Sequence, residues 1–330
     1  MKNSNQKPIR YEWEPFPFGD GEQIFDIRYD PVFKAVFTKD TYESRCALSK
    51  LISALIGHTV VVETIIVNEP PIDDLRQKYL RFDVACKTEK GELVNVEMAF
   101  NPIASEPVRL EYYVSRLFAG QDLHGKDKKY DDLKETYQIA ILANEKFYND
   151  ENFIHNFVYS DLENRISLGG RTKIITVELV KTEPAVGKPV EEMTNAELWA
   201  VFFQYLTDPE KRDKINKIIN QEEGIAMAVD TLINITKDEE EFARMTTLIK
   251  SELDWRSGMA DAENKGRSEG LIEGRSEGLI EGRSEGLIEG RSEGRNEANM
   301  ENARKMKAMG LLSEQIQAVT GLSPEIIAKL

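Results

Sequence analysis

Two apolar segments separated by a short polar turn constrain the fold more than any other feature of the sequence. Residues 81–87 alternate polar and apolar side chains around Phe82 and Val84, and residues 92–100 form a second strand-like run. Residues 88–91, between them, are polar and end in glycine, which is typical of a β-hairpin loop. The sequence therefore predicts an antiparallel pair of strands.

The segments around this hairpin predict helices and further strands. Asp30 can cap a helix that has Pro31 at its first position, and a second helix follows Asp40 and ends at Gly57. Further strand-like runs cover residues 59–67, 137–142, 153–159 and 173–180, and further helical patterns cover residues 107–121 and 194–254. This order predicts an α/β fold with a mixed sheet flanked by helices.

The chain of 330 residues is long enough for one α/β domain with accessory helices. We expect five successive segments. They are an irregular lead-in (1–25), an α/β domain (26–185), a helical region (186–258), a repeat segment (259–298) and a small C-terminal helical unit (299–330).

Bulk composition narrows the function classes. The net charge of −15 argues against a protein that coats nucleic acid non-specifically, because neutralising phosphates requires Lys and Arg. It does not argue against a nuclease, whose metal site is acidic. No apolar run approaches the ~20 residues that span a bilayer, and the N-terminus lacks the apolar core of a signal peptide. We therefore expect a cytoplasmic protein without a membrane partner.

The cysteine and histidine content limits the kinds of metal site that the chain can form. Cys46 and Cys86 are the two cysteines, and together with the three histidines they show no zinc-site spacing. We expect both thiols to be free in a reducing compartment. Any bound metal should then be a hard cation held by carboxylates.

Residues 266–294 contain an eight-residue repeat, Gly-Arg-Ser-Glu-Gly-Leu-Ile-Glu, which starts at Gly266, Gly274 and Gly282. Each glycine costs a helix about 1 kcal/mol relative to alanine, which favours a flexible tether. Glycines four residues apart also lie near one helix face and admit a second helix closely. We favour a long helix that self-associates as a coiled coil. A recent repeat expansion without a selected function is a further alternative.

The C-terminal residues predict two short helices. Ser313 is expected to cap the first, and Ser323 and Pro324 to start the second. Such a pair resembles a helix-turn-helix. Lys329 is its only cation, so packing or oligomerisation is favoured over DNA recognition.

Asp83 and Glu97 are isolated carboxylates within the two apolar strands of the hairpin. Burying a carboxylate is costly unless it is paired or bound to a cation, and two neighbouring carboxylates repel unless positive charge lies between them. A Mg²⁺ ion, which prefers oxygen ligands, would resolve both problems and could activate a water. The alternative is a strand face that simply meets solvent.

Four segments carry a family resemblance: residues 30–37, 81–84, 90–98 and 109–116. In their order and spacing they resemble the Rpn family of recombination-promoting nucleases and transposases, in the PD-(D/E)XK nuclease superfamily. The glycine repeat and residues 320–323 are similar to that family's tail. The resemblance implies a restriction-endonuclease-like mixed sheet and a Mg²⁺- or Mn²⁺-dependent endonuclease that hydrolyses DNA phosphodiesters.

The resemblance also implies roles for individual residues. It places Asp83 and Glu97 on the two metal-binding carboxylates and Asp30 on a further acidic position. The family has Lys or Gln two residues after the glutamate, whereas this chain has Ala99. A methyl group can neither position a water nor stabilise developing charge.

Three explanations of this alanine stay open. The enzyme acts slowly with the metal alone, or the chain is a degenerate relative that binds DNA or self-assembles without cutting, or a neighbouring side chain takes over the missing role. The candidates for that replacement are Arg109, Gln121 and Lys78.

Basic side chains supply the candidate DNA contacts. Arg109 and Arg116 lie near one face of a predicted helix and suit bidentate phosphate contacts, although an ordinary helix surface is the alternative. Lys126, Lys128 and Lys129 form a basic loop that either meets phosphate or is merely solvated.

Overall fold

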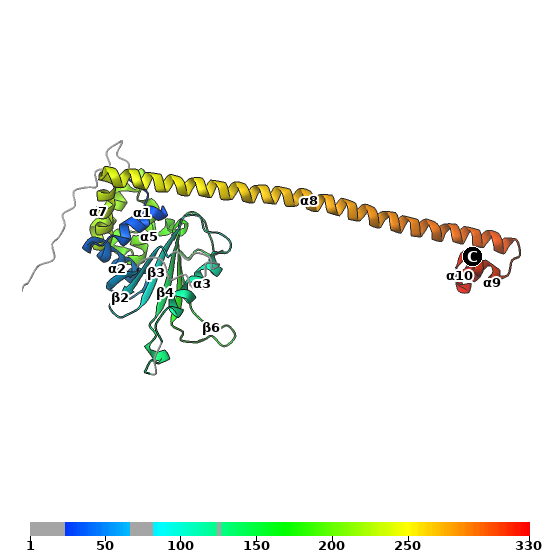
Figure 1. The fold of residues 1–330 in the computed structure, drawn as a ribbon, viewed down its shortest axis with the longest axis horizontal. Coiled ribbons are helices and arrows are strands. Elements are labelled where there is room, and N and C mark those ends of the chain that lie inside the picture. The colour runs from blue at the N-terminus through cyan, green and yellow to red at the C-terminus, as the bar shows by residue number, and fades with distance from the viewer. Residues whose placement is uncertain (1–23, 67–81, 124–126) are drawn as a thin grey trace, which may run out of the picture. The chain divides into compact units, whose positions relative to one another are not determined.

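The computed structural model describes residues 24–66, 82–123 and 127–330. In this part of the chain, six strands form one mixed sheet in the order β1-β2-β3-β4-β8-β5 (Figure 1). The strands are β1 (Val62–Ile66), β2 (Val84–Thr88), β3 (Leu93–Ala99), β4 (Thr136–Leu142), β5 (Ile154–Phe157) and β8 (Thr172–Glu178). Two short strands, β6 (Ser160–Asp161) and β7 (Ile166–Ser167), pair separately. The predicted mixed α/β fold is confirmed.

The predicted hairpin is the antiparallel pair β2–β3, with Val84 opposite Val96. Its turn contains Gly91 at φ +84°, a backbone conformation that favours glycine. Strands β3, β4 and β8 are mutually parallel. Their carboxyl ends therefore lie at the same edge of the sheet.

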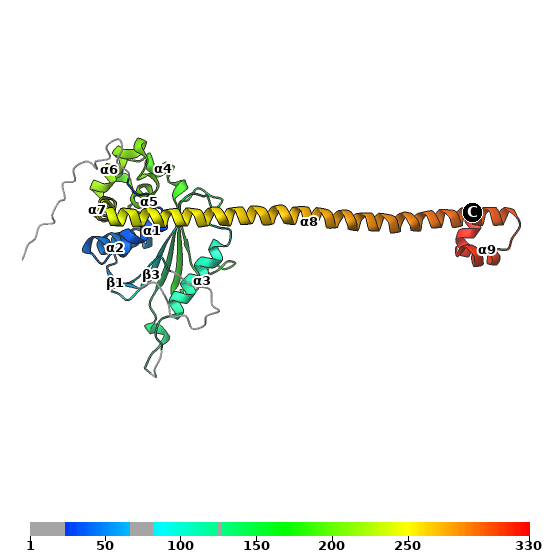
Figure 2. The same ribbon diagram turned by 45° about the horizontal axis from the view of Figure 1, so that its top comes forward.

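Helices cover both faces of the sheet, with α3 on the face opposite α1, α2 and α7 (Figures 1 and 2). The helices of this part are α1 (Asp30–Thr38), α2 (Tyr42–Ile56), α3 (Glu106–Ala119), α4 (Glu183–Val186), α5 (Asn195–Tyr205), α6 (Arg212–Gln221) and α7 (Glu223–Lys237). Four single turns of 3-10 helix are η1 (Tyr130–Asp132), η2 (Leu179–Lys181), η3 (Val190–Glu192) and η4 (Pro209–Lys211).

One apolar core joins the sheet to the helices of its first face. Helix α1 buries Val32, Phe33, Val36 and Phe37, spaced for one side of a helix, and Trp199 of α5 is completely buried in the same cluster. Burial of such side chains contributes about 1.5–3 kcal/mol each. The core therefore fixes α1, and with it Asp30 at the start of the helix, against the sheet.

The chain divides into two compact units, Met1–Ser251 and Glu252–Leu330. Helix α8 (Glu239–Ala308) begins in the first and ends in the second, and it contains the whole glycine repeat. The favoured helix is therefore observed in place of a tether. Between Gly266 and Gly294, a Cβ added at any glycine would have no heavy atom within 4 Å beyond the helix's own backbone. The three Leu-Ile pairs of the repeat are 65–69% exposed.

The C-terminal unit has a small core of its own, made by Ala303, Ile316, Leu322 and Ile327. The core packs α9 (Ser313–Thr320) and α10 (Pro324–Lys329) against the end of α8. Pro324 starts α10 as predicted.

The predicted cap at Ser313 is wrong. The N-cap position of α9 is Leu312, whose backbone N–H donates to the Gln315 side chain at 3.0 Å. The glutamine thus satisfies a helix-terminal donor from inside the first turn, which makes a serine cap unnecessary.

Two further expectations concern the cysteines and membrane-spanning helices. Cys46 and Cys86 are both free, as predicted, and burial raises the pKa of the Cys86 thiol to about 12. In the described part of the chain, no helix is both long and apolar enough to cross a membrane.

Candidate active site

Asp83 and Glu97 face each other at the open end of the β2–β3 hairpin. Val84 pairs with Val96 in the antiparallel register, so the residue before Val84 lies opposite the residue after Val96. Glu97 of β3 pairs with Arg109 of α3, whereas Asp83, just before β2, pairs with Lys34 of α1. Asp83 is 9% exposed and Glu97 is 3% exposed. The two carboxylates thus come from the two arms of one hairpin, and the negative charge of Asp83 acts on Glu97.

Lys34 of α1 joins Asp83 to Asp30. Its Nζ lies 2.9 Å from Asp30 Oδ2 and 2.9 Å from Asp83 Oδ1. Lys34 follows Asp30 by four residues, so both side chains lie on the same side of the helix. Burial alone would lower the pKa of Lys34, but the negative charges of Asp83 and Asp30 raise it above its usual value. The ammonium group is therefore charged.

Arg109 of α3 approaches the cluster from the other side and ion-pairs with Glu97. The same guanidinium lies 2.6 Å from Glu106 Oε1, a buried carboxylate one turn earlier in α3. It also lies over the ring of Tyr113, 5.5 Å from the ring centroid. Arg109 is thus the predicted replacement candidate that the structure brings to Glu97.

Gln138 of β4 also reaches Glu97, and sequence reasoning missed it. Its Nε2 donates to Glu97 Oε2 at 3.3 Å, and its Oε1 accepts from Asn95 Nδ2 at 2.9 Å. All three side chains are buried. The contact depends on the parallel pairing of β3 with β4, which sets Asn95 beside Gln138.

Burial governs the acidities of the two facing carboxyl groups. It raises the pKa of Asp83 to about 7, with the charge of Asp30 adding to the shift and Lys34 opposing it. It raises the pKa of Glu97 to about 8, with the charge of Asp83 adding and Arg109 opposing. The ion pairs therefore only partly offset the cost of burying these charges.

The cluster as a whole has more negative than positive charge. Four carboxylates minus two cations leave two formal negative charges. The carboxylates belong to Asp30, Asp83, Glu97 and Glu106, and the cations are Lys34 and Arg109. Protons or a divalent cation would neutralise this excess.

The residues fit a hard divalent cation in donor chemistry. The candidate metal ligands are carboxylate oxygens. One of them, Asp30 Oδ1, is buried without a hydrogen-bond partner. Within the described ranges, no group of three or more His, Cys, Asp and Glu side chains is gathered closely enough to hold a metal ion. Mg²⁺ usually keeps several waters and uses one or two protein carboxylates.

Ala99, at the end of β3, is enclosed by apolar side chains. It packs in a cluster with Leu110, Ala140 and Leu142, so no polar group enters the site from this strand position. Gln121 bonds to Lys134 and Thr136 near the start of β4, which is the end of that strand remote from Ala99. The third predicted replacement, Lys78, lies outside the described residues.

The remaining basic candidates are spread along the chain. Arg116 is half-buried on α3, two turns beyond Arg109, and Lys128 and Lys129 are exposed in the loop before β4. Lys126 lies outside the described residues. Of the basic side chains predicted to contact DNA, the structure thus brings Arg109 to the carboxylates.

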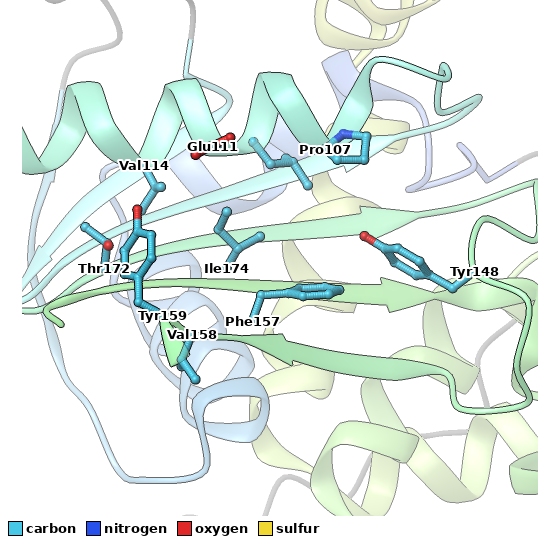
Figure 3. A pocket seen from close by; sticks show the side chains of 10 residues that line it. Pro107, Glu111, Val114, Tyr148, Phe157, Val158, Tyr159, Thr172 and Ile174 are labelled. Atoms are coloured by element: carbon cyan, nitrogen blue, oxygen red, sulfur yellow. The ribbon is translucent and has the colours of Figure 1, made fainter. Parts of the chain in front are cut away.

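A cavity of about 300 Å³ lies on the other flank of α3, facing strands β5 and β8 (Figure 3). Its walls are mainly apolar and aromatic, with Tyr148, Phe157 and Tyr159 opposite the helix. Glu111 is the one charged side chain among the described residues that line it. The cavity therefore offers no cation for a phosphate, unlike the carboxylate cluster.

Comparison with known proteins gives one match, to a family model. No curated protein and no solved structure matches the chain. The sequence model of the PD-(D/E)XK nuclease family transposases matches residues 27–262, which include the sheet, α1 and α3. The match confirms the superfamily expected from the short motifs. The chain belongs to the PD-(D/E)XK nuclease family transposases.

Proposed function

We propose that this protein is a DNA endonuclease that hydrolyses phosphodiesters with Mg²⁺ or Mn²⁺ held by Asp83 and Glu97, assisted by Asp30. One observation carries the proposal: two buried carboxylates lie at the same end of one hairpin, within a cluster that has two uncompensated formal negative charges. A divalent cation matches that charge, and oxygen donors match its preference. Membership of a nuclease family supports the reaction class.

The chain's own residues would prepare the site for hydrolysis. A bound Mg²⁺ would supply an activated water and stabilise the leaving oxygen. Arg109 holds Glu97 from one side and Gln138 holds it from β4, so the carboxylate keeps one orientation. Rigid placement of such groups lowers the cost of reaching the transition state.

Plasmid nicking tests the proposal. Wild-type protein should nick supercoiled DNA with Mg²⁺ or Mn²⁺ and not with EDTA. Asp83→Asn and Glu97→Gln should each lower the rate by about 100-fold or more. Glu111→Gln, on the exposed side of α3, is the matched control and should cut normally. Equal nicking by wild type and Asp83→Asn would reject the proposal.

A second candidate is a protein that keeps the nuclease fold but does not cut. The apolar packing of Ala99 favours it, because no Lys or Gln can act from that strand position. Restoring a polar group by Ala99→Gln or Ala99→Lys discriminates the two. A rise in nicking would indicate an enzyme that lacks one group, whereas an inactive wild type and inactive variants would indicate a binding or assembly protein.

We also propose that the repeat over residues 266–294 mediates self-association. Exposed Leu-Ile pairs recur along it, and its glycines leave open space for a second helix. A single exposed helix with this many glycines is costly, which favours a partner. Light scattering should give more chains per particle for the full protein than for a chain that ends at Met259. Equal association states would reject this role.

A further inference from the structure

Lys34 lies within residues 30–37, one of the segments that carry the family resemblance, but the sequence analysis assigned it no role. It comes from α1, whose apolar side is locked into the core by Phe33 and Phe37, and its ammonium group bridges Asp30 and Asp83. Its side chain is 26% exposed, so this cation is held in the carboxylate cluster and still reaches solvent.

An ammonium group has three N–H donors. Asp30 and Asp83 accept two of them at 2.9 Å each, which leaves a donor for a third acceptor at the exposed edge of the cluster. An oxygen of an anionic phosphodiester is an acceptor of the right charge. Because negative charge builds up on a phosphate during its hydrolysis, a fixed cation there stabilises the transition state.

The other groups near the carboxylates are less suited to this contact. The guanidinium of Arg109 is engaged by Glu97, Glu106 and the face of Tyr113. Gln138 is neutral, and its amide is committed to Asn95 and Glu97.

We propose that Lys34, on helix α1, is the residue that contacts the reacting phosphate and supplies the positive charge that Ala99 cannot. The inference rests on the proposed nuclease function. It assigns to a helix the task that the family resemblance places on strand β3. Lys34 is then a catalytic residue, and its two carboxylate contacts position it.

The test compares wild type with Lys34→Gln and Lys34→Arg in plasmid nicking with Mn²⁺. Lys34→Gln should lower kcat by about 100-fold, with a smaller change in KM. Lys34→Arg keeps the charge and should retain activity within about 10-fold of wild type. Lys39→Gln is the matched control, because Lys39 ends the same helix and lies 4.0 Å from Glu241, away from the cluster. It should cut like wild type.

Binding of Mn²⁺ alone, measured by electron paramagnetic resonance, separates a catalytic role from a structural one. Lys34→Gln removes a positive charge beside two carboxylates, so Mn²⁺ should bind at least as tightly as to wild type. Loss of Mn²⁺ binding together with activity would overturn the inference, since Lys34 would then only maintain the site. Full nicking by Lys34→Gln beside an active wild type would also overturn it and leave the proposed function intact. An inactive wild type would reject both.

Discussion

Asp83 and Glu97 lie opposite each other at the end of one hairpin, and each pairs with a cation from a different helix. Lys34 of α1 pairs with Asp83, and Arg109 of α3 pairs with Glu97. The site is thus assembled from three elements that are separate in sequence. Because both carboxylates are buried, removing either cation would leave a buried carboxylate without its ion pair.

The first prediction concerns the pH dependence of stability without metal. The folded-state pKa values of Asp83 and Glu97, about 7 and about 8, lie above their ordinary values of 3.8 and 4.5. The folded state therefore binds more protons than the unfolded state between about pH 4 and pH 8. Stability should therefore fall as the pH rises through this window. Urea unfolding in EDTA at several pH values measures this.

Two comparisons check the cause of that dependence. Asp83→Asn and Glu97→Gln should each flatten the decline, because the neutral amides do not titrate. Mn²⁺ should stabilise the protein more at pH 8 than at pH 6, because it competes with the protons for the same oxygens. A stability that rises from pH 5 to pH 8 in EDTA would contradict the assigned shifts.

The second prediction contrasts two glutamines. Gln138→Leu should lower the free energy of unfolding by about 1–3 kcal/mol, because it leaves the buried Asn95 amide without a partner and removes one of the two contacts of Glu97. Gln121→Leu removes bonds to the Lys134 backbone at a partly exposed position, so it should cost less. Urea denaturation of both variants measures the difference. Equal losses would show that Gln138 is not an obligatory part of the buried network.

Local patterns in the sequence were sufficient for the elements that lie close together in the chain. Alternation and the glycine turn predicted the β2–β3 hairpin, and so predicted that Asp83 and Glu97 come from its two arms. The Asp30-Pro31 pair predicted the start of α1, which begins at Asp30. These features follow from periodicity and turn chemistry, which act over a few residues.

Long-range pairing could not be obtained in the same way. Gln138 reaches Glu97 because β4 joins β3 in parallel across 41 residues of sequence, and no local pattern sets that register. In the sequence alone, Lys34 is indistinguishable from an ordinary helix lysine. Only the packing of α1 brings it to Asp83. The sequence motif directed attention to Ala99 and to nearby replacements, whereas the cation beside Asp83 comes from 49 residues before it.

The third prediction concerns a buried ion pair away from the candidate active site. Lys181 and Glu178 lie 2.6 Å apart, with side chains 2% and 0% exposed. Glu178 also accepts the backbone N–H groups of Phe147 and Tyr148. Lys181→Met should therefore lower the free energy of unfolding by about 3–5 kcal/mol, because it leaves a buried carboxylate without its cation.

Lys146→Met is the matched control for that variant. Lys146 pairs with Glu151 at 2.8 Å, but their side chains are 49% and 89% exposed. Solvent and salt screen such pairs, so this variant should unfold like wild type. A comparable loss in both variants would contradict a special contribution from the buried pair.

The fourth prediction contrasts glycines in two environments. In the repeat, Gly274 and Gly282 have open space around an added Cβ, so Gly274→Ala and Gly282→Ala should each stabilise α8 locally by about 1 kcal/mol. In α7, a Cβ on Gly224 would collide with Cβ of Lys50 and lie 3.2 Å from Trp199 Cζ2. Gly224→Ala should therefore destabilise the protein, by about 1–3 kcal/mol.

Circular dichroism and amide hydrogen exchange, at concentrations where the chain is a single copy, distinguish these outcomes. The two repeat variants should raise helicity and slow exchange in residues 266–294, while Gly224→Ala should lower the unfolding midpoint. Faster exchange in the repeat variants would contradict the prediction. At higher concentrations, where copies of the chain associate, a smaller associated mass for the repeat variants than for wild type would indicate that the glycines pack against a second helix.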